Sequence, residues 1–140
     1  MLVKDVMSER IIFIRPQDSI QRAIMTMVKH DISGLTVVAE GKRLVGMLTM
    51  KDIFRKVLAR DKDPKTTVVS DVMSSPVIFI HPLDTIGEAA ETMAQKNIKR
   101  LVVVNSANVP TGIITAMDIV GGTPEMLDVM FSTWVKPTWR

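Results

Sequence analysis

Two short segments of this sequence place a glycine, a threonine and an aspartate at the same spacing. Residues 46–52 read Gly-Met-Leu-Thr-Met-Lys-Asp, and residues 112–118 read Gly-Ile-Ile-Thr-Ala-Met-Asp. Each segment follows an apolar run and precedes a helical pattern, so we expect a strand-to-helix junction at both places. A threonine followed three residues later by an acidic residue is close to a capping box, which would make the pattern structural. The same groups could bind a ligand, because a carboxylate accepts hydrogen bonds from ribose hydroxyls and N–H groups at a helix start attract anions.

The chain contains two copies of one sequence unit, and the agreement between the copies favours the ligand-binding interpretation. Asp-Val-Met-Ser at residues 5–8 returns at residues 71–74, and Ile-Phe-Ile at residues 12–14 returns at residues 78–80. The same offset relates the two Gly-x-x-Thr-x-x-Asp segments, and the alignment needs no gap. We therefore divide the chain into a first motif at residues 1–60, a polar linker at 61–68, a second motif at 69–122 and a helical tail at 123–140.

Each motif is predicted to fold as strand, helix, strand, strand, helix. Short β-branched runs indicate the strands, and apolar residues at helical spacing from Ile20 and Ile86 indicate the first helices, with Asp18 and Asp84 as N-caps. A second helix is expected over Lys51–Arg60 and after Ala116. The fold class is therefore α+β, with two small sheets packed by pseudo-two-fold symmetry, since each sheet alone buries one face. The predicted strands are Ile11–Ile14, Gly34–Val38, Leu44–Leu48, Val77–Ile80, Arg100–Val104 and Thr111–Ile114.

The two copies resemble a pair of CBS motifs, named after cystathionine β-synthase, in the arrangement called a Bateman module. The resemblance rests on the Asp-Val-Met-Ser opening, the Ile-Phe-Ile-x-Pro-x-Asp-x-Ile run, the Leu-x-Val-Val strand and the Gly-x-x-Thr-x-x-Asp end. It implies binding of AMP, ADP, ATP or S-adenosylmethionine in clefts between the paired motifs, and regulation of an attached or separate protein. It also implies a disc-like homodimer formed through the helices.

The resemblance further implies roles for individual residues. The aspartates would hold the ribose with support from the threonines, two paired segments would lie against the adenine ring, and a basic pair would bind phosphate. Ser33 stands at the position of that basic pair in the first motif, so we expect the Asp52 cleft, facing Lys99 and Arg100, to be the tighter phosphate site. The predicted ligand-binding residues are Thr49, Met50, Asp52, Thr115, Ala116, Asp118, Arg10, Ile11, Ile12, Pro76, Val77, Ile78, Ser33, Lys99 and Arg100.

Composition narrows the class of protein. The 140 residues include no cysteine and two histidines, which disfavours a thiolate or histidine metal centre, and no catalytic cofactor is expected. The formal charge of +3 suits anionic ligands. We see no signal peptide and no membrane-spanning run, and expect a cytoplasmic protein. AMP is the favoured ligand because one cleft has two basic residues and no phosphate loop, while ADP, ATP and S-adenosylmethionine stay open.

Other functions remain alternatives at this point. The basic isoelectric point of about 9.4 is the one feature that favours a nucleic-acid-binding protein. A ligand-free dimerisation scaffold would use Thr-x-x-Asp only as a helix cap. An enzyme is the least favoured class, because no nucleophile and base stand at a suggestive spacing. The tail, with Trp134 and Trp139, could dock on a partner or on its own subunit.

Overall fold

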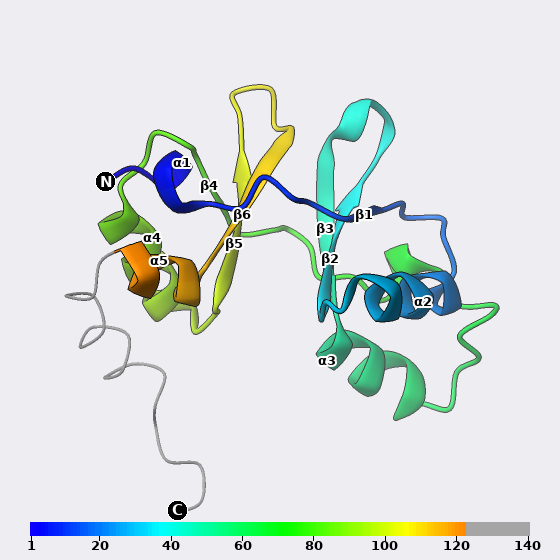
Figure 1. Cartoon of the computed structure of the whole chain (residues 1–140). Coiled ribbons are helices and arrows are strands. Elements are labelled where there is room, and N and C mark those ends of the chain that lie inside the picture. The colour runs from blue at the N-terminus through cyan, green and yellow to red at the C-terminus, as the bar shows by residue number, and fades with distance from the viewer. Residues whose placement is uncertain (123–140) are drawn as a thin grey trace, which may run out of the picture. The chain divides into compact units, whose positions relative to one another are not determined.

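A computed structural model describes residues 1–122 of the chain (Figure 1). The helical tail expected at 123–140 lies outside the described residues. The described chain forms two compact units, one made of Ile12–Val77 and the other joining Met1–Ile11 to residues 78–122. We name them the Asp52 unit and the Asp118 unit after one aspartate in each. In the described part of the chain, no helix has the length and apolar character needed to cross a membrane.

The two units share one topology, which confirms the α+β class. In each, a central strand pairs in parallel with a short first strand and antiparallel with the third strand. The sheet orders are β1-β2-β3 and β4-β5-β6. The elements of the Asp52 unit are β1 (Phe13–Ile14), α2 (Ile20–His30), β2 (Gly34–Val38), a 3-10 turn (Glu40–Lys42), β3 (Leu44–Thr49), α3 (Met50–Ile53), a π-helix (Phe54–Leu58) and a 3-10 turn (Val69–Asp71). Those of the Asp118 unit are α1 (Val3–Val6), β4 (Phe79–Ile80), α4 (Ile86–Lys96), β5 (Arg100–Val104), β6 (Pro110–Thr115) and α5 (Ala116–Gly122).

Helices cover one face of each sheet and enclose a separate apolar core (Figure 1). The third strands β3 and β6 alternate buried and half-buried residues, as expected of a strand with one face in a core. Leu48 of β3 and Ile114 of β6 are fully buried at equivalent positions. Ile20 and Ile86, which begin the helical apolar patterns, are buried in these two cores.

The N-caps of the first helices differ from the sequence prediction. The N-caps of α2 and α4 are Ser19 and Thr85, one residue after the expected aspartates. Asp18 and Asp84 instead accept hydrogen bonds from the N–H groups of Arg15 and His81, at 3.0 and 2.9 Å, and so close the preceding turn. Because each aspartate side chain is bound to the turn, it does not cap the helix. The hydroxyl of the next residue, Ser19 or Thr85, caps the helix instead.

The helix expected over Lys51–Arg60 is also not a single α-helix. It continues from α3 as a π-helix, with the Ala59 N–H donating to the Phe54 carbonyl five residues earlier at 2.8 Å. The predicted strand Ile11–Ile14 likewise shortens to β1, because only Phe13 and Ile14 have partners in the register with β2.

The opening segment of each motif packs on the sheet of the other motif. Ser8 exchanges main-chain hydrogen bonds with Ile113 of β6 at 2.8 and 2.9 Å, and Ser74 does so with Met47 of β3 at 2.8 and 3.1 Å. Val3 and Val69 donate equally at 2.8 Å to the carbonyls of Asp84 and Asp18. The same contacts thus recur in both units. Each unit, however, receives its opening segment from the other motif: the first motif supplies that of the Asp118 unit, and the second motif supplies that of the Asp52 unit.

A methionine from each opening segment occupies the space above a glycine. A Cβ added at Gly112 would lie 2.6 Å from Met7 Sδ and 3.0 Å from the Ser8 carbonyl oxygen, and one added at Gly46 would overlap Met73 Sδ. Both glycines are buried. The glycine of each Gly-x-x-Thr-x-x-Asp segment is therefore explained by packing, because any side chain there would displace the opening segment.

Gly46→Ala should destabilise the protein by about 1–3 kcal/mol through overpacking against Met73. Adding Met73→Ala should recover part of that loss, since the flexible end of the methionine is then gone. Gly121→Ala is the control, because a Cβ there meets nothing within 4 Å. Chemical denaturation measures all three variants, and a Gly46→Ala protein as stable as the Gly121→Ala protein would contradict the packing account.

Candidate functional site

The junction between β3 and α3 is a complete capping box. The Asp52 N–H donates to Thr49 Oγ1 at 3.2 Å, and the Thr49 N–H donates to Asp52 Oδ2 at 3.0 Å. The Thr49 hydroxyl also donates to the same carboxylate oxygen at 3.1 Å. The structural interpretation of Thr-x-x-Asp is therefore confirmed, and any ligand function is additional to it.

The junction between β6 and α5 repeats this geometry. The Thr115 N–H donates to Asp118 Oδ2 at 2.8 Å, and the Asp118 N–H donates to Thr115 Oγ1 at 3.2 Å. Each aspartate is thus held by its threonine at the start of its own helix, in the same way in both units. Fixed carboxylates of this kind lose little conformational freedom when they accept a further hydrogen bond.

The strand register brings further predicted residues beside each junction. Thr49 pairs with Gly34, and the Met50 N–H donates to the Ser33 carbonyl at 3.0 Å. In the Asp118 unit, Thr115 pairs with Arg100, and the Ala116 N–H donates to the Lys99 carbonyl at 2.9 Å.

Each unit therefore gathers part of the predicted set at the end of its sheet. Those parts are Ser33, Thr49, Met50 and Asp52 in one unit, and Lys99, Arg100, Thr115, Ala116 and Asp118 in the other. The pairing of Lys99 and Arg100 with the Asp52 cleft stays a prediction.

The first-turn N–H groups contribute less to anion binding than the sequence suggested. The N–H of Met50 is bound to Ser33, and that of Asp52 is bound to Thr49. The corresponding groups of Ala116 and Asp118 are bound to Lys99 and Thr115. Because two first-turn donors at each junction are already paired, fewer N–H groups are left for an anion, and side chains gain importance for anion recognition there.

The second carboxylate oxygen distinguishes the two aspartates. Asp52 Oδ1 accepts a hydrogen bond from the Ser74 hydroxyl at 3.3 Å and forms an ion pair with Lys56 Nζ at 3.3 Å. Within residues 1–122, no side chain forms a hydrogen bond or an ion pair with Asp118 Oδ1. The residue at the Lys56 position of the second motif is Gly122, and the equivalent of Ser74 is Ser8, whose hydroxyl accepts from the Arg10 N–H at 3.3 Å.

Lys56 and Ser74 were not among the residues predicted from the sequence. The Asp52–Lys56 spacing of four residues was a visible signal, because such pairs face each other on a helix. Ser74 gave no comparable signal, because it reaches Asp52 only through the pairing of the opening segment with β3.

Arg100 is a half-buried cation beside Thr115. Burial lowers the pKa of its guanidinium below the ordinary value, although arginine stays charged at neutral pH. Lys99, which precedes it, is exposed. A cation that is partly removed from water interacts more strongly with an anion than a fully hydrated one does.

The residues expected against adenine belong to the two places where the chain passes from one unit to the other. Ile12, Pro76 and Val77 are part of the Asp52 unit, and Arg10, Ile11 and Ile78 are part of the Asp118 unit. Ile12 packs on the core of its unit, whereas the Ile78 side chain is 37% exposed. The structure thus gives Ile12 a core role, and the contact of all six with adenine stays a prediction.

Comparison with known proteins identifies the family of this chain. The model of the CBS domain matches twice, at residues 3–59 and 69–122. The CBS domain-containing protein YhcV of Bacillus subtilis (strain 168) is 35% identical over 117 residues, which are 84% of this chain and 81% of YhcV. Inosine-5'-monophosphate dehydrogenase of Korarchaeum cryptofilum is 33% identical over 109 residues, but this match spans 78% of the chain and only 21% of that enzyme.

A solved structure agrees with the sequence comparison. The CBS domain pair of protein MJ0100, crystallised in complex with 5'-methylthioadenosine and S-adenosyl-L-methionine, superposes with a TM-score of 0.79 at 32% identity. The match covers 89% of this chain and 97% of that structure. With two matching domains, a close relative of similar length and a shared fold, this chain belongs to the CBS-domain family as a tandem pair of CBS domains.

Proposed function

We propose that this chain is a regulatory module that binds an adenosine-containing ligand and acts on a separate protein, with AMP as the first candidate. The observation that supports it most is the paired Thr-x-x-Asp junction, in which the Asp118 carboxylate is held firmly and keeps one oxygen uncontacted by residues 1–122. The MJ0100 domain pair binds two adenosine compounds, which supports the ligand class. ADP, ATP and S-adenosylmethionine are the other candidates.

The proposed chemistry assigns the ribose to the aspartates. A carboxylate with a fixed orientation can accept from both hydroxyls of a ribose, and hydrogen bonds to a charged group contribute about 1.5–3 kcal/mol each. Thr49 and Thr115 keep their aspartates in place. We assign the adenine ring to the two segments in which the chain passes from one unit to the other, which contain Ile11 and Val77.

Phosphate recognition is assigned to Lys99 and Arg100. Both follow α4 and lie beside the Thr115 junction, and Arg100 is partly buried. Guanidinium and ammonium groups are the usual protein partners of phosphate. A ligand with at least one phosphate therefore fits the charge of this region better than an uncharged nucleoside does.

Asp52→Asn together with Asp118→Asn should weaken binding of AMP by at least about tenfold, because the amide keeps a cap acceptor but loses the charge. Isothermal titration of AMP, ATP and S-adenosylmethionine into the wild-type protein and this double variant measures the effect. Asp61→Asn, in the exposed loop after the π-helix, is the matched control. Saturable binding that survives unchanged in the double variant would remove the aspartates from the proposal, and no binding of any adenosine compound to folded wild-type protein would favour the scaffold.

Lys99→Gln should reduce the affinity for AMP about threefold to tenfold and leave the affinity for adenosine unchanged, since only AMP carries a phosphate. The same titrations at low and high salt provide a second readout, because the charge contribution is screened. Lys96→Gln, an exposed position in the last turn of α4, is the control for net charge. Equal losses for AMP and adenosine would place Lys99 away from phosphate.

We also propose that the chain self-associates through helices of the Asp52 unit. Large apolar side chains are exposed there: Phe54 and Leu58 on the π-helix are 53% and 54% exposed, and Val28 on α2 is 72% exposed. When a second copy covers exposed apolar side chains of this size, their surface is removed from water, which favours association. The exposure of these apolar side chains favours a homodimer, which the resemblance to CBS pairs also implies.

Replacing Phe54 and Leu58 by serine should shift the protein from dimer to monomer in analytical ultracentrifugation, because the apolar contact is lost. Leu83→Ser is the control, since Leu83 is 69% exposed but lies in the Asp118 unit. A wild-type monomer at all concentrations, or a dimer that the double variant leaves intact, would contradict the proposed interface.

A further inference from the structure

The Asp52 carboxylate has already used its hydrogen-bonding capacity within its own unit. Oδ2 accepts from the N–H and the hydroxyl of Thr49, and Oδ1 accepts from the Ser74 hydroxyl and forms an ion pair with Lys56. An ionised carboxylate offers about four acceptor positions, so these four contacts fill it. A ribose that needs this carboxylate must displace at least one present partner.

Lys56 is the partner that costs most to displace. Its ammonium group lies 3.3 Å from Asp52 Oδ1 and also donates to the Val72 carbonyl at 2.9 Å. The Asp52 side chain is 14% exposed and that of Lys56 is 37% exposed, so water screens this pair less than it screens a fully exposed one. Two anchors on one ammonium group hold it against the carboxylate, unlike a mobile surface lysine.

The Asp118 carboxylate has fewer hydrogen-bonding partners than that of Asp52 within residues 1–122. Its Oδ2 accepts from the Thr115 N–H, and no contact to Oδ1 is found within residues 1–122. Gly122 stands where the first motif has Lys56, so the second motif cannot form the equivalent ion pair. The same Thr-x-x-Asp sequence thus produces one satisfied carboxylate and one with acceptor positions to spare.

We propose that Lys56 is a specificity-determining residue that closes the Asp52 junction to ribose, so that the Asp118 junction binds an adenosine ligand first. This inference rests on the proposed function, because it concerns which of two adenosine sites is occupied. It differs from the expectation from the sequence, in which the Asp52 cleft is the tighter phosphate site. Lys56 acts by competing with the ligand for Asp52, and its removal exposes the carboxylate.

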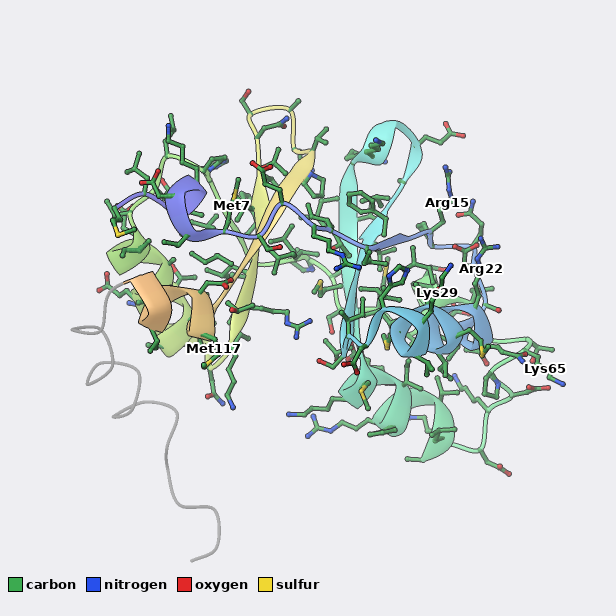
Figure 2. The ribbon with its side chains drawn as sticks, in the orientation of Figure 1. Met7, Arg15, Arg22, Lys29, Lys65 and Met117 are labelled. Carbon is green, nitrogen blue, oxygen red and sulfur yellow. The ribbon has the colours of Figure 1, made fainter. Side chains whose placement is uncertain are left out.

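The test uses adenosine, an uncharged probe, and the full chain carrying Asp118→Asn so that the Asp52 junction is measured by itself. Adding Lys56→Met should raise the affinity for adenosine roughly tenfold, because the methionine keeps the apolar stem and removes the competing charge. Lys65→Met is the matched control, because it is the same substitution in the same unit. Lys65, labelled in Figure 2, is exposed on a loop and has no ion pair with Asp52. Isothermal titration measures affinity and stoichiometry for the three proteins.

Thermal unfolding of each variant shows that it is folded. If the Lys56→Met variant is not folded, Lys56→Gln replaces it, since an amide can still donate to the Val72 carbonyl without forming an ion pair with Asp52. An affinity of the Lys56 variant equal to or below that of the Lys65 control overturns this inference, while adenosine binding by the wild-type chain leaves the proposed function standing. No adenosine binding by any of the proteins, wild type included, overturns this inference, and if the wild-type chain also fails to bind AMP, the proposed function falls with it.

Discussion

The structure depends on the main-chain pairing of each opening segment with the third strand of the other motif. Ser8 pairs with Ile113 and Ser74 with Met47, and the methionine before each serine fills the space above a glycine of the same strand. Buried main-chain groups must be paired, so β3 and β6 each need their opening segment. The repeated sequence motif is therefore not the folding unit: a motif cut out at residues 1–60 would lack the segment that covers its own sheet.

The same pairing builds the candidate site. Ser74 is brought to Asp52 because it lies beside Met47, and Lys56 of the π-helix donates to the Val72 carbonyl of the same opening segment. The aspartate of one motif is thus tied to the chain segment that begins the next. A ligand that draws Asp52 away from Ser74 and Lys56 would loosen that attachment, which gives a physical route from ligand to conformation.

Sequence reasoning predicted the repeat, the strand and helix order, and the start of each junction, because these follow from apolar periodicity and local capping. Gly34–Val38 and Arg100–Val104 agree with the strands observed. The N-caps were misplaced from Ser19 and Thr85 to the neighbouring aspartates, since a sequence does not show which of two adjacent oxygens closes the preceding turn. The partners of Asp52 were missed for another reason: Ser74 is adjacent only through strand pairing, a contact between residues far apart in sequence.

The central claim is that a Thr-x-x-Asp junction of this CBS pair holds the ribose of an adenosine ligand. A crystal structure of the full chain grown with AMP tests it most directly. We expect ribose hydroxyls within about 3 Å of the Asp118 carboxylate oxygens, with Thr115 still capping α5. AMP bound away from both Thr-x-x-Asp junctions, or absent from the crystal at saturating concentration, would contradict it.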